Sequence, residues 1–292
     1  MIEQPMSAIS FRPAAVNCFN MFFHGQSLTL LEWICMQSFV EHGHRLQLHS
    51  YEPIEVPTGV EVVDAGNTIP YDDFFIFDNS PSAFTNMFRY KLLLECGGWW
   101  VDTDVLCLTE DIPPCTYAWS YQDPEQINGA VLKFPQGDSV CKILLDKSKE
   151  RSTSLSAWGQ LGPALLTEVL AEFHPRGHFG SPEKFYPTHW LEAHICWTKG
   201  MCDFVESRVK NAVFLHFWNS VLTRMGITLA NRAPSDSFFE RLQFNRNDLD
   251  ETSPDMERQI NENIRYILTW KPRYRDLYEK KMKREWNYIF PV

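Results

Sequence analysis

The chain alternates short apolar runs with longer segments in which apolar residues recur every three or four positions. The short runs predict buried strands, and the longer spacing predicts amphipathic helices. Near the start, a strand, a helix and a strand follow one another, which favours a βαβ unit and a parallel sheet. We therefore expect an α/β fold. Strands are predicted over residues 16–23, 45–51, 60–63, 99–101, 117–121, 127–134 and 213–217, and helices over residues 30–39, 84–96, 139–150 and 162–173.

The pattern changes beyond Asn231. Residues 236–288 predict two or three amphipathic helices, whereas residues 151–160 and 174–187 lack a period and predict loops. A chain of 292 residues is long enough for one large domain with a small addition. We expect a main domain over residues 1–235 and a helical C-terminal extension over residues 236–292 that packs on it.

Residues 97–104, Gly-Gly-Trp-Trp-Val-Asp-Thr-Asp, are the most informative stretch. Asp102 and Asp104 lie two residues apart after an apolar run, so a strand would place both carboxylates on one face. Two such carboxylates suit a hard divalent cation, Mg²⁺ or Mn²⁺. The pair also follows the carboxyl end of a predicted strand, where open α/β sheets bind ligands.

The segment before this stretch predicts a helix with defined ends. Ser80 suits the capping position, and Pro81 suits the first turn. Gly97 fits the position at which a helix stops. A second D-x-D triplet, at residues 248–250, has no strand before it and lies in a polar stretch. We interpret that copy as a solvated turn or helix start.

Residues 88–104 resemble the signature of the DXD-containing sugar-binding glycosyltransferases, glycosyltransferase family 32. The resemblance is strong over residues 17–108 and weaker to residue 219. Within the family, the chain resembles bacterial capsular or lipopolysaccharide-type members. It implies a GT-A fold, a Rossmann-like nucleotide-binding sheet flanked by helices. It also implies a nucleotide-sugar donor and retention of anomeric configuration.

The resemblance also implies a metal shell. It gives Asp104 and Asp102 a role in metal binding and catalysis, and Arg89 a catalytic role beside the donor. Residues 216–219 are similar to a His-x-Trp-Asn motif of the family, which implies His216 as the third ligand and Asn219 in the same shell. Without the resemblance, a histidine at a strand end is more often only a satisfied polar group.

Donor contacts are implied at several further positions. Asn86 departs from the family pattern, because many relatives have aspartate there, although an amide can still bond sugar hydroxyls. The loop at residues 158–163 either binds an anion or sugar or simply starts a helix, and residues 128–129 lie near the acceptor or form a turn. The implied donor-binding residues are Phe23, His24, Gly25, Asn86, Arg89, Gly98 and Asp102.

Composition narrows the remaining possibilities. The net charge of −10 argues against a nucleic-acid binder. No apolar run is long enough for a transmembrane helix, and the start lacks a secretory signal, so we expect a cytoplasmic protein. The eight cysteines show no zinc spacing and are expected to be reduced. Residues 271–285 are basic and predict a helix, which is expected to be either a solvated face or a peripheral contact with the inner membrane face.

Together with the metal-type carboxylate pair, the resemblance implies a retaining, metal-dependent glycosyltransferase of polysaccharide biosynthesis. Its donor is expected to be a UDP-hexose, such as UDP-galactose, UDP-glucose or UDP-GlcNAc, and its acceptor a glycan or a lipid-linked glycan. Three alternatives stay open: a GDP-mannose-type mannosyltransferase of the same fold, a metal-dependent hydrolase, and a non-catalytic sugar- or nucleotide-binding relative.

Overall fold

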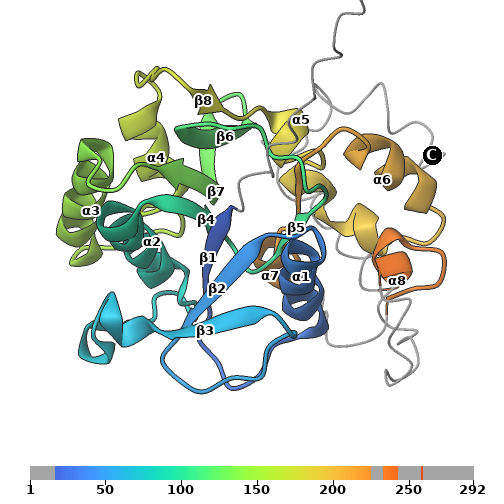
Figure 1. Ribbon diagram of the computed structural model, residues 1–292, viewed down its shortest axis with the longest axis horizontal. Coiled ribbons are helices and arrows are strands. Elements are labelled where there is room, and N and C mark those ends of the chain that lie inside the picture. Colours follow the sequence, from blue (N-terminus) through green and yellow to red (C-terminus); the bar gives the residue numbers. More distant parts are fainter. Residues whose placement is uncertain (1–16, 225–232, 243–257, 259–292) are drawn as a thin grey trace, which may run out of the picture.

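A mixed seven-stranded sheet forms the centre of the protein (Figure 1). The structure is a computed structural model, and it describes residues 17–224, 233–242 and 258. A second, two-stranded sheet pairs β5 (Val105–Cys107) with β9 (Phe214–His216). The strands of the central sheet are, in spatial order, β3 (Val60–Asp64), β2 (Arg45–Ser50), β1 (Cys18–Phe22), β4 (Gly98–Val101), β7 (Gln126–Phe134), β6 (Tyr117–Asp123) and β8 (His178–Phe179).

The first half of the sheet is parallel, as the βαβ pattern predicts. β1 pairs in parallel with both β2 and β4, and β2 pairs in parallel with β3. Helix α1 (Leu30–Glu41) connects β1 to β2, and Glu32 accepts hydrogen bonds from Thr29 at its start. β7 runs antiparallel to β4 and β6. The predicted α/β class is confirmed.

The sheet separates two hydrophobic cores. On one face, α2 (Ser82–Cys96), α3 (Ser139–Ser152) and α4 (Pro163–Leu170) pack together, and Figure 1 shows them on the side of the sheet away from α1. Because successive strand residues point to opposite faces, Trp100 packs in the core under these helices, whereas Trp99 packs in the core with α1, β5 and β9. Both indole rings are fully buried.

Helix α2 carries the expected signature, and its ends differ slightly from the prediction. Gly97 ends the helix with φ +66, and a Cβ there would lie 2.4 Å from the backbone nitrogen of Gln136, so glycine is required. At the start, Pro81 occupies the capping position and Ser80 lies one residue earlier than predicted. The Ser80 hydroxyl still accepts a hydrogen bond from the backbone N–H of Ser82, at 3.2 Å.

Residues 174–187 are not only loop, as the sequence predicts. They contain β8 and the short helix α5 (Pro182–Phe185). A strand of two residues has no periodicity to detect, and it forms only because β6 offers an open edge for parallel pairing. The remaining short elements are η1 (Ala65–Asn67), η2 (Tyr71–Asp73), η3 (Trp190–Trp197), α6 (Cys202–Val209), α7 (Asn219–Arg224) and α8 (Phe238–Leu242).

The predicted C-terminal extension is described only at its start. In α8, the ring of Phe239 stacks on Trp197 at 5.0 Å and meets the edge of Phe217 at 5.5 Å. The second D-x-D triplet and the basic segment at residues 271–285 lie outside the described residues, so the boundary at residue 235 stays a prediction. In the part of the chain that the structure describes, no helix is long and apolar enough to cross a membrane.

Candidate metal and donor site

Asp102 and Asp104 lie in a tight turn between the two sheets. β4 ends at Val101, and the N–H of Val105 donates to the carbonyl of Asp102 at 3.1 Å. The expectation that both carboxylates share one strand face is therefore wrong, because the chain leaves the central sheet here to form β5. The turn nevertheless brings the carboxylates together. One ligand atom from each of Asp102, Asp104 and His216 lies within 4.8 Å of the others.

Asp102 is held by groups from three elements. The Nη2 atom of Arg89, on α2, donates to its Oδ1 at 3.0 Å, and the Nε1 atom of Trp100, on β4, donates to the same oxygen at 2.8 Å. Its backbone N–H donates to the carbonyl of Ala130 on β7 at 2.8 Å. Among the described residues, none donates to the second carboxylate oxygen, which leaves that oxygen available for a cation.

Asp104 is held from the opposite side by the strand β9 and the residues after it. Its Oδ2 lies 3.2 Å from Nε2 of His216 and accepts the backbone N–H of Asn219 at 2.8 Å. The pairing of β5 with β9 sets this contact, because Val105 lies opposite His216. Asp104 and His216 are only 8% and 6% exposed.

Trp218 fixes the positions of His216 and Asn219 around Asp104. Its φ of +59 is unusual for a large side chain and turns the backbone so that the N–H of Asn219 reaches Asp104. Its ring lies 4.1 Å from that of His216, and its Nε1 donates to the carbonyl of Thr188 at 3.1 Å. The sequence did not reveal this role, because a backbone conformation leaves no signal in the residue pattern.

The two carboxylates differ electrostatically. Burial raises the pKa of Asp102, the charge of Arg89 opposes that rise, and the charge of Asp104 adds to it. Burial also acts to raise the pKa of Asp104, but the charge and hydrogen bond of His216, together with backbone hydrogen bonds that include the N–H of Asn219, outweigh it and leave that pKa lowered. A divalent cation between them would favour the ionised form of both groups.

The donor set fits a metal ion chemically. Two carboxylates and an imidazole are ligands for Mn²⁺ or Mg²⁺ with room for phosphate oxygens. Nδ1 of His216 is buried and has no hydrogen-bond partner among the described residues, which is unusual for a histidine held only for structure. Asn219 reaches this group through its backbone N–H, and its side chain is half-buried.

The position of Arg89 depends on Gly129, a residue for which the sequence allowed either a turn or a place near the acceptor. Its Nη1 donates to the carbonyl of Gly129 at 2.5 Å, and a Cβ at Gly129 would lie 2.2 Å from that nitrogen. Gly129 and Asn128 belong to β7, so the turn interpretation is wrong. Asn128 bonds locally, accepting from the N–H of Ala130 at 2.6 Å.

Asn86 lies on the same helix as Arg89, beside the loop at residues 158–163. Its Nδ2 donates to the carbonyl of Ser82 at 2.7 Å, and a Cβ on Gly162 would lie 3.0 Å from its Oδ1. The hydroxyl of Tyr90 donates to the carbonyl of Leu161 at 2.7 Å. These contacts fix the loop against α2, and Pro163 starts α4 as expected.

Phe23, His24 and Gly25 follow the carboxyl end of β1. β1 and β4 are parallel neighbours, so this group and Asp102 lie at the same edge of the sheet. The ring of His24 lies 4.2 Å from that of Phe74, and a Cβ on Gly25 would lie 3.0 Å from the Phe23 ring. Gly98, in contrast, begins β4, which places it roughly 13 Å from Asp102 at about 3.3 Å per residue. The structure does not bring Gly98 to the other candidate residues.

Comparisons with known proteins do not assign the chain to a family. No family model and no curated protein matches it. Among solved structures, it is similar to the PaToxG glycosyltransferase, with 9% identity and a TM-score of 0.44, covering 85% of this chain and 84% of that one. It is similar to the galactosyltransferase LgtC in complex with donor and acceptor sugar analogues, with 11% identity, a TM-score of 0.41, and coverage of 82% and 99%.

A further similar structure is the glycosyltransferase GlyE of Streptococcus pneumoniae TIGR4. The identity is 10%, the TM-score is 0.40, and the match covers 91% of this chain and 64% of that one. Likenesses at such identities and scores carry no functional argument. Membership of glycosyltransferase family 32 therefore stays a prediction.

Proposed function

We propose that this protein is a metal-dependent glycosyltransferase that takes a sugar from a nucleotide-sugar donor. One observation carries the proposal: Asp102, Asp104 and His216 converge within 4.8 Å just beyond the carboxyl end of β4, a parallel neighbour of β1. A parallel α/β sheet binds ligands at this edge. A D-x-D carboxylate pair with an imidazole and a nearby guanidinium suits a diphosphate and its cation.

Asp102, Asp104 and His216 would hold Mn²⁺ or Mg²⁺. When bound, the ion would offset the negative charge that grows on a departing nucleoside diphosphate. Arg89 fixes one oxygen of Asp102, at 3.0 Å, and so would leave the other oxygen free to hold the cation. The N–H of Asn219 fixes one oxygen of Asp104 in a similar manner, and the ring of Trp218 packs against His216.

The donor would lie between the ends of β1 and β4. Phe23, His24 and Gly25 would border the base, and the ring of His24 is already placed by its contact with Phe74. Asn86 would bond hydroxyl groups of the sugar from its position beside Gly162. We favour a UDP-hexose donor and transfer with retention, in which the donor phosphate itself helps to take the proton from the acceptor hydroxyl.

The acceptor would be a glycan or a lipid-linked glycan of a polysaccharide pathway. The hydroxyl group of the acceptor would meet the donor sugar at the edge of the sheet that carries Asp102. Neither the donor nor the linkage is determined by Asp102, Asp104 and His216, because these residues would bind only the diphosphate and its ion.

Release of nucleoside diphosphate tests this proposal. The protein is incubated with a panel of UDP- and GDP-sugars and Mn²⁺, with and without EDTA, beside Asp104→Asn. Asp146→Asn is the matched control, because Asp146 is an exposed partner of Lys142 on α3. We expect release from one donor, lost with EDTA and at least about 100-fold slower in Asp104→Asn. Equal release by Asp104→Asn, or release of free phosphate instead, would contradict the proposal.

A further inference from the structure

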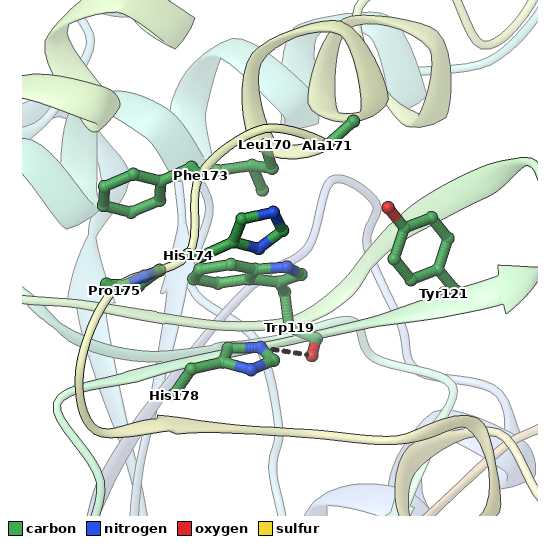
Figure 2. Close-up of a pocket in the computed structure, with 8 residues that line it drawn as sticks. All are labelled: Trp119, Tyr121, Leu170, Ala171, Phe173, His174, Pro175 and His178. Carbon is green, nitrogen blue, oxygen red and sulfur yellow. Dashed lines mark hydrogen bonds between the residues drawn. The ribbon is translucent and has the colours of Figure 1, made fainter.

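A second, aromatic pocket lies two strands away from the candidate metal site. It is lined by residues of β6, of the end of α4 and of the segment that leads into β8, and it encloses about 210 Å³ (Figure 2). Pockets for drug-sized ligands measure roughly 300–1,000 Å³, so this one suits a ligand of a single ring. The principal lining residues are Trp119, Tyr121, Leu170, Ala171, Phe173 and His174.

Trp119 is held rigidly in this pocket. Its ring stacks on Phe134 at 5.9 Å and on Phe173 at 5.8 Å, and the ring of His178 lies 4.0 Å away. Nε2 of His178 donates to the carbonyl of Trp119 at 3.0 Å, as the dashed line in Figure 2 shows. Rings fixed in this manner lose little side-chain entropy when a ligand binds.

The indole nitrogen of Trp119 has no acceptor among the described residues. The residue as a whole is only 4% exposed, but this nitrogen is not one of the fully buried polar atoms and can be reached from the pocket. Figure 2 shows this nitrogen on the side of Trp119 nearer to Tyr121, whose ring stands on the same strand. The pocket therefore offers an accessible N–H donor that a bound ligand could engage.

The chemistry of the lining favours a sugar ring. Leu170, Ala171 and Phe173 supply apolar surface, while the indole N–H, the hydroxyl of Tyr121 and the exposed ring of His174 supply polar groups. A pyranose matches this mixture, because its C–H groups form apolar faces and its hydroxyl groups surround the ring. A few directed polar groups in an apolar lining are what fix the orientation of a small ligand.

The position of the pocket relates it to the candidate metal site. β4 and β6 are both antiparallel to β7, so they run in the same direction and their carboxyl ends lie at the same edge of the sheet. β6 is two strands from β4, a separation of roughly 10 Å across the sheet. The pocket also lies back from the carboxyl edge, because Trp119 is the third residue of β6 and His178 pairs with Tyr117 at its start. A single sugar at the metal site would not reach the pocket, whereas a short oligosaccharide would.

We propose that this pocket binds a non-reacting sugar ring of an oligosaccharide acceptor. The inference rests on the proposed glycosyltransferase function, since it makes the acceptor a glycan of several rings with its far ring against Trp119 and Tyr121. The site is distinct from the donor site, because none of its lining residues contacts Asp102, Asp104 or His216 among the described contacts.

Saturation-transfer NMR tests the pocket without relying on turnover. The probes are methyl glycosides of glucose, galactose, mannose and N-acetylglucosamine, the disaccharides lactose, maltose and chitobiose, and, as rivals, uridine and guanosine. Ala171→Phe fills the pocket from the end of α4 and leaves Trp119 in place. Glu172→Phe adds the same ring at the next, exposed residue, which does not line the pocket.

We expect at least one saccharide to bind the wild type and Glu172→Phe, and to bind Ala171→Phe at least about tenfold more weakly. Trp119→Phe keeps one aromatic ring and removes the pyrrole ring with its N–H, so we expect about 3- to 10-fold weaker binding. Binding of no saccharide, equal binding by Ala171→Phe, or loss of nucleoside rather than saccharide binding would overturn the inference. Acceptor-independent release of nucleoside diphosphate should be unchanged in Ala171→Phe, so failure of the pocket and failure of the proposed function are distinguishable.

Discussion

Nη2 of Arg89 lies 3.0 Å from Oδ1 of Asp102, and this ion pair joins helix α2 to the turn after β4. The guanidinium is 6% exposed and the carboxylate 26% exposed. A pair that is buried to this degree holds the carboxylate in one orientation, and removal of one partner leaves the other charge unpaired. Arg89 thus acts on the candidate metal site through Asp102.

Replacement of Arg89 by methionine should destabilise the protein. It leaves Asp102 and the carbonyl of Gly129 without their donors, at a cost of about 3 kcal/mol in the free energy of unfolding. Urea denaturation measures this difference. Arg45→Met is the matched control, because the Arg45–Glu61 pair is 64% and 54% exposed and should contribute less than about 1 kcal/mol. Equal losses in the two variants would contradict the structural role of Arg89.

Gly129→Ala should displace the Arg89 guanidinium. The added Cβ would lie 2.2 Å from Nη1 of Arg89 and 2.9 Å from Cδ1 of Leu166, so we expect a loss of about 1–3 kcal/mol in stability and weaker Mn²⁺ binding. Gly137→Ala meets no atom within 4 Å, and its φ of +74 costs about 1 kcal/mol without touching the metal site. Calorimetry with Mn²⁺ compares the two, and unchanged affinity in Gly129→Ala would refute this dependence.

Stability should fall in mildly acidic solution because of His49. Burial lowers the pKa of His49 to about 4, while its side chain lies 3.0 Å from the amide oxygen of Asn20. In the unfolded chain His49 binds a proton near pH 6.5, whereas in the folded chain it stays neutral down to about pH 4. The contribution of His49 to stability is therefore present above pH 6.5 and is lost as pH falls toward 4. The contribution should be about 2 kcal/mol between pH 7 and pH 5.

His49→Gln keeps a polar group for Asn20 and removes the titration. Unfolding free energies of both proteins at pH 7, 6 and 5 test the prediction, and the difference between them isolates His49 from the other histidines. We expect the variant to lose less stability than the wild type on acidification. Parallel pH profiles would show that His49 does not cause the loss.

Trp218→Gly should separate backbone strain from ring contact. Glycine adopts φ +59 without cost, so the backbone N–H of Asn219 can still reach Asp104, but the ring against His216 is lost. We expect weaker Mn²⁺ binding, and Trp218→Phe, which keeps a ring, should bind Mn²⁺ more tightly than Trp218→Gly. If Trp218→Gly instead bound Mn²⁺ more tightly than Trp218→Phe, the backbone and not the ring would control His216.

The sequence predicts the fold where local pattern and tertiary structure agree. β1, α1 and β2 follow from periodicity, and Gly97 ends α2 as expected, because these features depend on neighbouring residues. The strand β8 was not predictable, since two residues form a strand only where β6 offers an open edge. The C-terminal extension beyond residue 242 is largely outside the described residues.

The candidate site was predictable in its residues and less so in its geometry. The D-x-D spacing identified Asp102 and Asp104, but it did not reveal that the chain turns between two sheets at this point. The grouping of His216 with them depends on the pairing of Val105 with His216, a contact between residues over 100 positions apart. Gly129 acts by allowing the Arg89 guanidinium close to the backbone, and Trp218 acts through its positive φ. The pattern of residue types along the sequence reveals neither feature.

Mn²⁺ binding tests the central claim most directly. Electron paramagnetic resonance counts free Mn²⁺ in titrations of the wild type, Asp104→Asn, His216→Gln and the control Asp146→Asn, each with and without UDP. The account predicts about one bound ion per wild-type and Asp146→Asn chain, tighter with UDP, and at least about tenfold weaker binding in the other two variants. Equal Mn²⁺ affinity in all four proteins would contradict a metal site at Asp102, Asp104 and His216.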